Sequence, residues 1–250
     1  MSDDRSFESA WVAVVDVHGW MSEGQARLLY AASAATQVGD TIVEIGSFRG
    51  RSTVVLAMAA PIGVEVVAIE PHAGNDRGPQ EIEGFATDAA IDLEVFRANL
   101  AAAGVTDRVR HVRMFSEQAQ REVTGDVALL YVDGAHRYGP ARADIRDWGS
   151  RVRPGGTLMI HDSFSSVGVT LATMRELMFS RHWRYVERSR SLALYRADLA
   201  DNGRARAANS ARQMLQLPWF VKNLLVKVAL TFKFGALRQK LTGRATDWPY

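Results

Sequence analysis

Apolar residues gather along the chain in short continuous runs that turn residues separate. Runs of this length are typical of strands buried on both faces of a parallel sheet. They lie at residues 41–44, 64–69, 127–132 and 157–160, and residues 109–114, where apolar and polar residues alternate, fit a further strand. Two later apolar segments, at residues 185–187 and 191–195, are expected to pair as an antiparallel hairpin.

Between these runs, apolar residues recur at the three- and four-residue spacing of helices. Helices are expected over residues 6–37 with a break at Gly19, and over 51–60, 89–103, 139–152 and 167–181. Residues 71–88 are rich in glycine, proline and acids, which predicts a loop that closes over a ligand. Strands that alternate with helices and end in a hairpin predict a doubly wound, mostly parallel α/β sheet of the Rossmann-like kind.

The last fifth of the chain has a different pattern. Residues 201–203 predict a linker, so we divide the chain into an α/β domain with N-terminal helices, residues 1–202, and a helical tail, residues 203–250. In residues 219–233 one helical face is apolar and lysines occupy the other side. Such a basic amphipathic helix either contacts a membrane surface through residues 215–240, or packs on the domain or on a partner subunit of a homo-oligomer.

Charge and composition narrow the chemistry. Residues 203–250 carry nine basic side chains and one acid, whereas residues 1–202 carry 21 basic and 27 acidic ones. The apolar core of the tail argues against nucleic-acid binding. The chain has no cysteine and its first 221 residues have no lysine. Thiol catalysis, zinc–thiolate sites, a Walker A loop and Schiff-base chemistry in the α/β domain are therefore excluded.

Sequence features also bear on localisation. The acidic start of the chain lacks the apolar segment of a secretory signal. No stretch reaches the roughly 18–20 apolar residues that cross a bilayer. We therefore expect a cytoplasmic protein, with peripheral contact at the inner face of the membrane if the tail binds lipid.

A glycine loop follows the first predicted strand. Gly46 and Gly50 allow a sharp turn close to a ligand, before a helix that is expected to begin near Arg51 with Ser52 or a neighbour as N-cap. Glu70 ends the next strand, where an acid accepts hydrogen bonds from a ribose diol. Each feature alone also fits a plain turn or a solvated acid, but together they predict an adenosine-type nucleotide.

Polar residues also end two later strands. Asp133 and His136 follow the run at 127–132, and His161 and Asp162 follow the run at 157–160. Adjacent parallel strands lie about 4.8 Å apart, so the two acids are expected to share one divalent cation, or else only to position the nucleotide. His136 is expected to act as a general base, or else to make local hydrogen bonds at a helix start. His18, His111 and His182 are expected to be ordinary surface or packed residues, and none of the scattered tryptophans is expected to form a stacking platform.

These motifs together resemble class I S-adenosylmethionine-dependent methyltransferases over residues 18–197. They are most similar to the metal-dependent O-methyltransferase branch that includes macrolide-sugar methyltransferases and cephalosporin-hydroxylase-like proteins. The resemblance implies a set of residues around the methionine end of the cofactor: Glu44, Gly46, Ser47, Gly50 and Ser52. It also implies that Glu70 binds the ribose and that Ser116 lies near the adenine, and His72 is a further candidate for cofactor contact.

The resemblance further implies a metal-assisted reaction. Asp133 and Asp162 are the candidate ligands for Mg²⁺, but His161 stands where the family usually has a second acid. A nitrogen ligand at that place favours Mn²⁺ or a later transition metal. Catechol methyltransferases carry lysine at the spacing of His136, whereas the related sugar methyltransferases carry histidine.

We therefore predict an S-adenosylmethionine-dependent O-methyltransferase that acts on a small-molecule or oligosaccharide acceptor, which by the resemblance is a saccharide or a glycosylated metabolite. Two rival predictions stay open. The first is a nicotinamide-dependent oxidoreductase on the same fold, which the incomplete glycine pattern disfavours. The second is a non-catalytic membrane-associated module. Hydroxylase chemistry ranks below both, because no triad of two histidines and one carboxylate stands out.

Overall fold

The computed structural model describes residues 6–74 and 86–231. One seven-stranded sheet runs through the middle of the chain, in the order β3-β2-β1-β4-β5-β7-β6. Its strands are β1 (Thr41–Ile45), β2 (Glu65–Ile69), β3 (Val109–Val112), β4 (Val127–Val132), β5 (Val152–Ile160), β6 (Arg184–Ser189) and β7 (Leu192–Arg196). The first five are parallel, and β7 runs antiparallel to both β5 and β6. The predicted doubly wound sheet and its antiparallel hairpin are confirmed.

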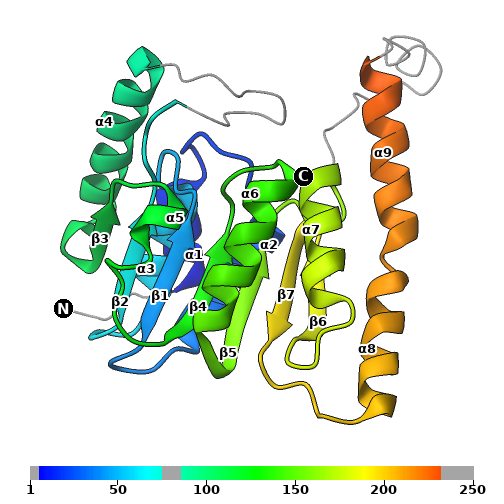
Figure 1. Ribbon diagram of the computed structural model, residues 1–250. Helices are drawn as coiled ribbons and strands as arrows, with labels where there is room; N and C mark the ends of the chain where they lie inside the picture. Colours follow the sequence, from blue (N-terminus) through cyan, green and yellow to red (C-terminus); the bar gives the residue numbers. More distant parts are fainter. Residues whose placement is uncertain (1–5, 75–85, 232–250) are drawn as a thin grey trace.

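Helices cover both faces of this sheet (Figure 1). They are α1 (Phe7–Val14), α2 (Glu23–Ala34), α3 (Arg51–Ala59), α4 (Ala86–Ala102), α5 (Ser116–Ala119), α6 (Tyr138–Ala143), α7 (Val167–Leu177), α8 (Gly203–Met214) and α9 (Leu217–Thr231). One buried apolar cluster joins the sheet to α1–α4, and a second joins its other face to α5–α7. The alternation of side chains along β1 explains this division, because Ile42 packs in the first cluster and Val43 in the second.

The strand order places a topological switch between β1 and β4. Their neighbours lie on opposite sides, since β1 continues to β2 and β4 continues to β5. Connections that leave a parallel sheet in opposite directions open a crevice at the carboxyl ends of the strands, where ligands bind. The segments after β1, β2, β4 and β5 carry the residues that the sequence singled out.

Some boundaries differ from the predicted ones. The helix expected over 139–152 is α6 followed by a π-helical turn, Asp144–Trp148, and a short 3₁₀ turn, Gly149–Arg151. α4 begins at Ala86, earlier than expected, and most of the predicted closing loop at 71–88 lies outside the described residues. The N-cap of α3 is Gly50, in the left-handed conformation, and Ser52 lies inside the helix.

The tail forms two helices that run beside β6 and α7 (Figure 1). Asn202 caps α8, because its side-chain oxygen accepts from the Ala205 backbone N–H at 2.8 Å. α8 begins at Gly203, and the later part of the tail, residues 232–250, lies outside the described residues. Among the helices that the structure describes, none is both long and apolar enough to cross a membrane.

Candidate active site

The glycine loop between β1 and α3 takes a conformation that only glycine adopts easily. Gly46 has φ +86° and Gly50 has φ +85°. A Cβ on Gly46 would collide with the backbone oxygen of Asp133, and one on Gly50 would press on the Phe96 ring. The loop therefore lies directly against the segment that follows β4, and both parts border one cavity.

Glu44 lies beneath this loop instead of in the wall of the cavity. Its side chain is fully buried and accepts hydrogen bonds from the hydroxyls of Ser47, Ser52 and Thr53. Burial raises the pKa of Glu44 to about 7, although these hydroxyls act in the opposite direction. Glu44 thus ties the loop to the first turn of α3, whereas Ser47 and Ser52 line the cavity.

Glu70 directly follows β2, where an acid that binds a ribose is expected. Its carboxylate accepts from the backbone N–H groups of Phe48 at 3.2 Å and His72 at 3.0 Å, which fixes its orientation at the cavity wall. His72 is buried at φ +46°, and its Nε2 lies 2.8 Å from the Phe48 carbonyl oxygen. His72 therefore links the glycine loop to the end of β2.

Ser116 borders the cavity together with an acid that the sequence did not single out. Its hydroxyl donates to the Asp144 carboxylate at 2.5 Å, and both residues line the wall near Phe115. Burial raises the pKa of Asp144 to about 6. The helical spacing of residues 139–152 placed Asp144 within an ordinary helix, but the π-helical turn begins at this residue.

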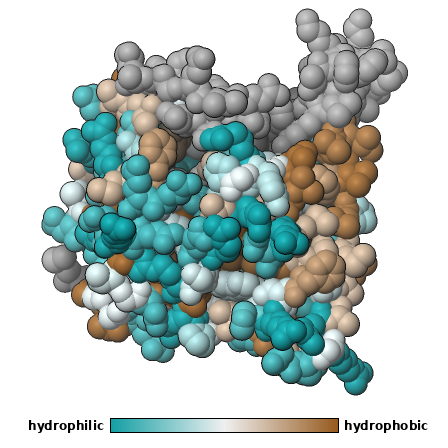
Figure 2. Space-filling view, in the orientation of Figure 1, coloured by the Kyte–Doolittle hydropathy of each residue, from teal (hydrophilic) through white to brown (hydrophobic). Residues whose placement is uncertain are grey.

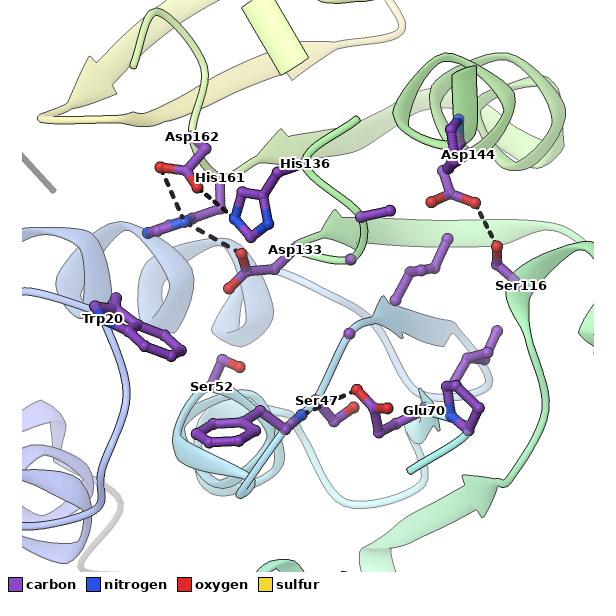
Figure 3. A pocket seen from close by; sticks show the side chains of 18 of the residues that line it. Trp20, Ser47, Ser52, Glu70, Ser116, Asp133, His136, Asp144, His161 and Asp162 are labelled. Atoms are coloured by element: carbon purple, nitrogen blue, oxygen red, sulfur yellow. Dashed lines mark hydrogen bonds and ion pairs between the residues drawn. The ribbon is translucent and has the colours of Figure 1, made fainter. Parts of the chain in front are cut away.

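The polar residues after β4 and β5 gather on the opposite wall (Figure 3). Asp133 Oδ2 accepts from the Tyr131 hydroxyl at 2.8 Å, and Asp133 Oδ1 lies 3.2 Å from His161 Nδ1. Burial alone would lower the pKa of His161, but the negative charges of Asp133 and Asp162 raise it to about 9. Gln25 reaches the same ring from α2, with its Nε2 3.2 Å from His161 Nε2.

Asp162 pairs with the predicted base. Its Oδ2 lies 2.6 Å from His136 Nε2, and its backbone has φ +57°, a conformation that is strained for a non-glycine residue. Burial alone would lower the pKa of His136, but the hydrogen bond and charge of Asp162, with the charge of Asp133, raise it above 6.5. The other ring nitrogen of His136, Nδ1, is buried and has no hydrogen-bond partner among the described residues.

The predicted cation ligands are thus neighbours, but they face imidazole rings. Asp133 and Asp162 each point to a histidine ring, and His161 stands between the two acids. Within the described part of the chain, no group of three histidine or acidic side chains is placed to hold a metal ion. The donor set as arranged does not fit a resident divalent cation, and the cation stays a prediction of the resemblance.

Most of these groups line one cavity of about 1290 Å³ at the carboxyl ends of the strands. Of the site residues that the sequence predicted, only Glu44 and Gly50 do not border it. The glycine loop and Glu70 form one wall, and Asp133, His136, His161 and Asp162 form the other. The residues that the sequence singled out therefore lie on two walls of one cavity.

The segment between α1 and α2 covers one end of the cavity with aromatic rings. Trp20 stacks on Phe48 with ring centroids 5.6 Å apart, and His18 packs edge-on against both. Arg51 holds this segment on α3, because its Nη1 donates to the carbonyls of Val17 and Gly19 at 3.0 Å each. His18 and Trp20 line the cavity, and Trp20 stacks on Phe48 although no stacking platform was expected among the tryptophans.

Comparison with known proteins agrees with this geometry. Residues 43–163, just under half of the chain, match a family model described as a methyltransferase domain. This match runs from Val43 in β1 to Ser163, just after β5, and it includes the cavity-lining residues between Ile45 and Asp162.

Solved structures show the same fold. Cofactor-bound Rv0187 from MTB is 22% identical, with 76% of this chain and 86% of that chain covered and a TM-score of 0.55. The O-methyltransferase NovP is 16% identical over 73% of this chain and 83% of that one, with a TM-score of 0.59. The O-methyltransferase TomG from Streptomyces achromogenes, solved in complex with SAM, is 20% identical over 79% and 91%, with a TM-score of 0.50.

The chain therefore shares its fold with solved O-methyltransferases, and its residues 43–163 are similar to a methyltransferase domain. Neither the fold nor the matched family model distinguishes a sugar-methyltransferase branch from a hydroxylase-like one.

Proposed function

We propose that the chain is an O-methyltransferase that uses His136 as general base on a hydroxyl of a saccharide or glycosylated metabolite. The observation that supports this proposal most is the 2.6 Å pair between His136 Nε2 and Asp162 Oδ2 at the cavity wall. An alcohol is a weak nucleophile near neutral pH, so its methylation benefits from a positioned proton acceptor.

The cofactor site supports the first half of the proposal. Gly46, Ser47 and Ser52 would hold the methionine end, and the Glu70 carboxylate would accept from the ribose hydroxyls. Ser116 and Asp144 would face the adenine. When bound, S-adenosylmethionine would supply an electrophilic sulfonium methyl group.

The second half concerns the proton. Asp162 holds the His136 ring at the cavity wall, and this ring would take the hydroxyl proton. As that proton leaves, the acceptor oxygen forms a bond to the methyl carbon, the carbon–sulfur bond breaks, and its electron pair stays on sulfur. The charge of Asp162 then stabilises the imidazolium ring. No step of this scheme needs a cation.

The acceptor would lie beside the aromatic group of His18, Trp20 and Phe48. Trp20 is half-exposed and borders the cavity, so it offers a flat apolar face next to the polar wall. A sugar ring, which has an apolar face and hydroxyls at its edge, suits such a surface.

Transfer of a labelled methyl group to a saccharide panel tests the proposal. We expect His136→Gln to lower kcat by about 10²-fold or more with an unchanged dissociation constant for S-adenosylmethionine, whereas His182→Gln, an exposed control, changes neither. Equal turnover of the His136→Gln enzyme would contradict the base assignment. Each assay is repeated with a chelator, and full activity is expected because no step needs a cation. Loss of activity that Mg²⁺ or Mn²⁺ restores would instead establish the cation that the resemblance predicts.

A further inference from the structure

Helices α8 and α9 leave apolar side chains exposed on the side that faces away from the sheet. We call this set the outward stripe: Met214, Leu215, Val221, Leu224 and Leu225. These side chains are between 38% and 74% exposed. Figure 2 shows a hydrophobic patch at the upper part of the same side of the molecule, where Figure 1 places α9 beside α7. Contiguous exposed apolar patches often mark interaction sites, whereas single exposed apolar side chains are common on any protein surface.

Polar side chains fix which face of these helices points inward. Asn209 accepts from the Tyr185 N–H at 2.7 Å and donates to the Trp183 carbonyl at 3.0 Å. Further along, Asn223 Nδ2 donates to the Phe164 carbonyl at 3.0 Å, although Asn223 lies in a largely apolar helix. Buried amides with satisfied hydrogen bonds define a single docking geometry. The inward face of these helices therefore holds amides beside Trp219 and Phe220, which pack against the core, whereas leucines stay exposed on the outer face.

Basic side chains accompany the stripe. Arg204, Arg212 and Lys222 are exposed on α8 and α9, and Lys222 lies 5.2 Å from the centre of the Trp219 ring. The sequence holds no acid between residues 202 and 246, and nine basic residues between 203 and 250. The surface thus combines exposed aliphatic groups with positive charge that no neighbouring acid of the same helices offsets.

We propose that the outward stripe of α8 and α9 docks on an anionic lipid bilayer, with the helices lying parallel to its surface. Aliphatic side chains at the acyl boundary and basic side chains at the headgroups are the pattern of interfacial helices. A second copy of the chain fits this surface poorly, because two copies would bring like charges face to face.

The docked orientation has a consequence for the cavity. Val167, the first residue of α7, is exposed, and it lines the cavity. The Asn223–Phe164 hydrogen bond places α9 next to the turn that precedes α7. A bilayer along α9 would therefore lie near the side of the cavity that α7 forms.

Flotation of the full chain with lipid vesicles tests the docking. We expect binding to vesicles of phosphatidylcholine with one third phosphatidylglycerol, weakening as salt rises, and little binding to phosphatidylcholine alone. The double variant Leu224→Ser, Leu225→Ser should lose most of this binding, and Lys222→Glu should weaken it roughly tenfold or more. Because these side chains are exposed, the melting temperature should not change.

A matched control is Ile62→Ser, which removes an aliphatic side chain that is 74% exposed from the turn between α3 and β2. This variant should bind vesicles as the unchanged protein does. The proposal is overturned if the full chain does not float with anionic vesicles, or if the double variant floats equally well. It is also overturned if sedimentation reveals a dimer that the double variant dissociates, since a second copy would then occupy the stripe.

Discussion

At the scale of single residues, Glu44 shows how a buried acid can organise a binding loop without facing the ligand. Three hydroxyls donate to its carboxylate, from the loop and from the first turn of α3. Such a carboxylate holds the backbone of the loop in place, but burial makes its negative form costly.

This cost predicts a pH dependence of stability. The pKa of Glu44 is raised from 4.5 to about 7 in the folded protein, mainly by burial. Between these pH values the folded state keeps a proton that the unfolded state loses, so the free energy of unfolding falls as pH rises and is level above about pH 7. The difference is on the order of 3 kcal/mol. In Glu44→Gln this part of the decline should disappear, as measured by denaturant unfolding at pH 5 and pH 8.

The exposed Glu94 of α4 provides the control for this measurement. Glu94→Gln should leave the difference between the two pH values as it is in the unchanged protein. If the free energy of unfolding of Glu44→Gln falls between pH 5 and pH 8 as steeply as that of the unchanged protein, the burial of Glu44 is not what makes stability depend on pH.

A second prediction at this scale concerns Asp162. Its hydrogen bond and charge raise the pKa of His136 against the effect of burial. A general base works when deprotonated, so kcat should rise with pH along a limb whose midpoint lies above 6.5. Asp162→Asn should move this midpoint to lower pH and reduce the plateau by about 10²-fold. If the midpoint of the kcat profile does not move in Asp162→Asn, a group other than His136 controls the pH dependence. The dissociation constant for S-adenosylmethionine shows whether the site of the variant remains folded.

At the scale of elements, the close packing of α7 against the segment after β4 positions His136. A Cβ on Gly168, the second residue of α7, would collide with the His136 carbonyl oxygen. Gly168→Ala should therefore push the 136–138 segment out of place. Because a displacement of about 1 Å can lower a rate by about 10²-fold, we expect a loss of that order in kcat.

Gly139→Ala is the matched substitution for this test. Gly139 lies in α6, only three residues from His136, and a Cβ there would meet open space. Alanine in a helix stabilises by up to about 1 kcal/mol relative to glycine, so this variant should keep its activity and melt at the same temperature or higher. If both variants lose activity equally, the collision at Gly168 is not the cause.

The elements also explain what the sequence could and could not predict. Buried strands and the residues that end them are visible in the apolar runs, so the amino-acid sequence was enough to place Glu70, Asp133 and Asp162 at one edge of the sheet. The apolar runs do not predict in which direction a side chain at that edge points. Glu44 turns under the loop because hydroxyls of α3 reach it, and these contacts form only once the helix packs.

Two features of the site depend on still longer-range packing. Trp20 joins the cavity wall because Arg51 binds the carbonyls of the segment before it, a contact that links residues more than thirty positions apart. Asp144 borders the cavity at the start of a π-helical turn, and helical spacing alone does not distinguish that turn from an α-helix. Neither arrangement has a local sequence signal.

At the scale of the whole molecule, the cavity joins the two halves of the sheet. The half with β1 to β3 supplies the glycine loop and Glu70, and the half with β4 and β5 supplies Asp133, His136 and Asp162. A cofactor that contacts both walls would connect the halves, and it would bind the folded chain far better than the unfolded one. Ligand binding should therefore appear directly as stability.

S-adenosylmethionine at 100 times its dissociation constant should raise the free energy of unfolding by about 2.7 kcal/mol. For a chain of this size that corresponds to roughly 5–10 °C in melting temperature. NAD at the same concentration should produce no shift, because the loop has only two of the three glycines of a dinucleotide site. Glu70→Ala should reduce the shift, since it removes the expected acceptor for the ribose, whereas His136→Gln should keep it. An equal shift with NAD would contradict the cofactor assignment and favour the oxidoreductase alternative on the same fold.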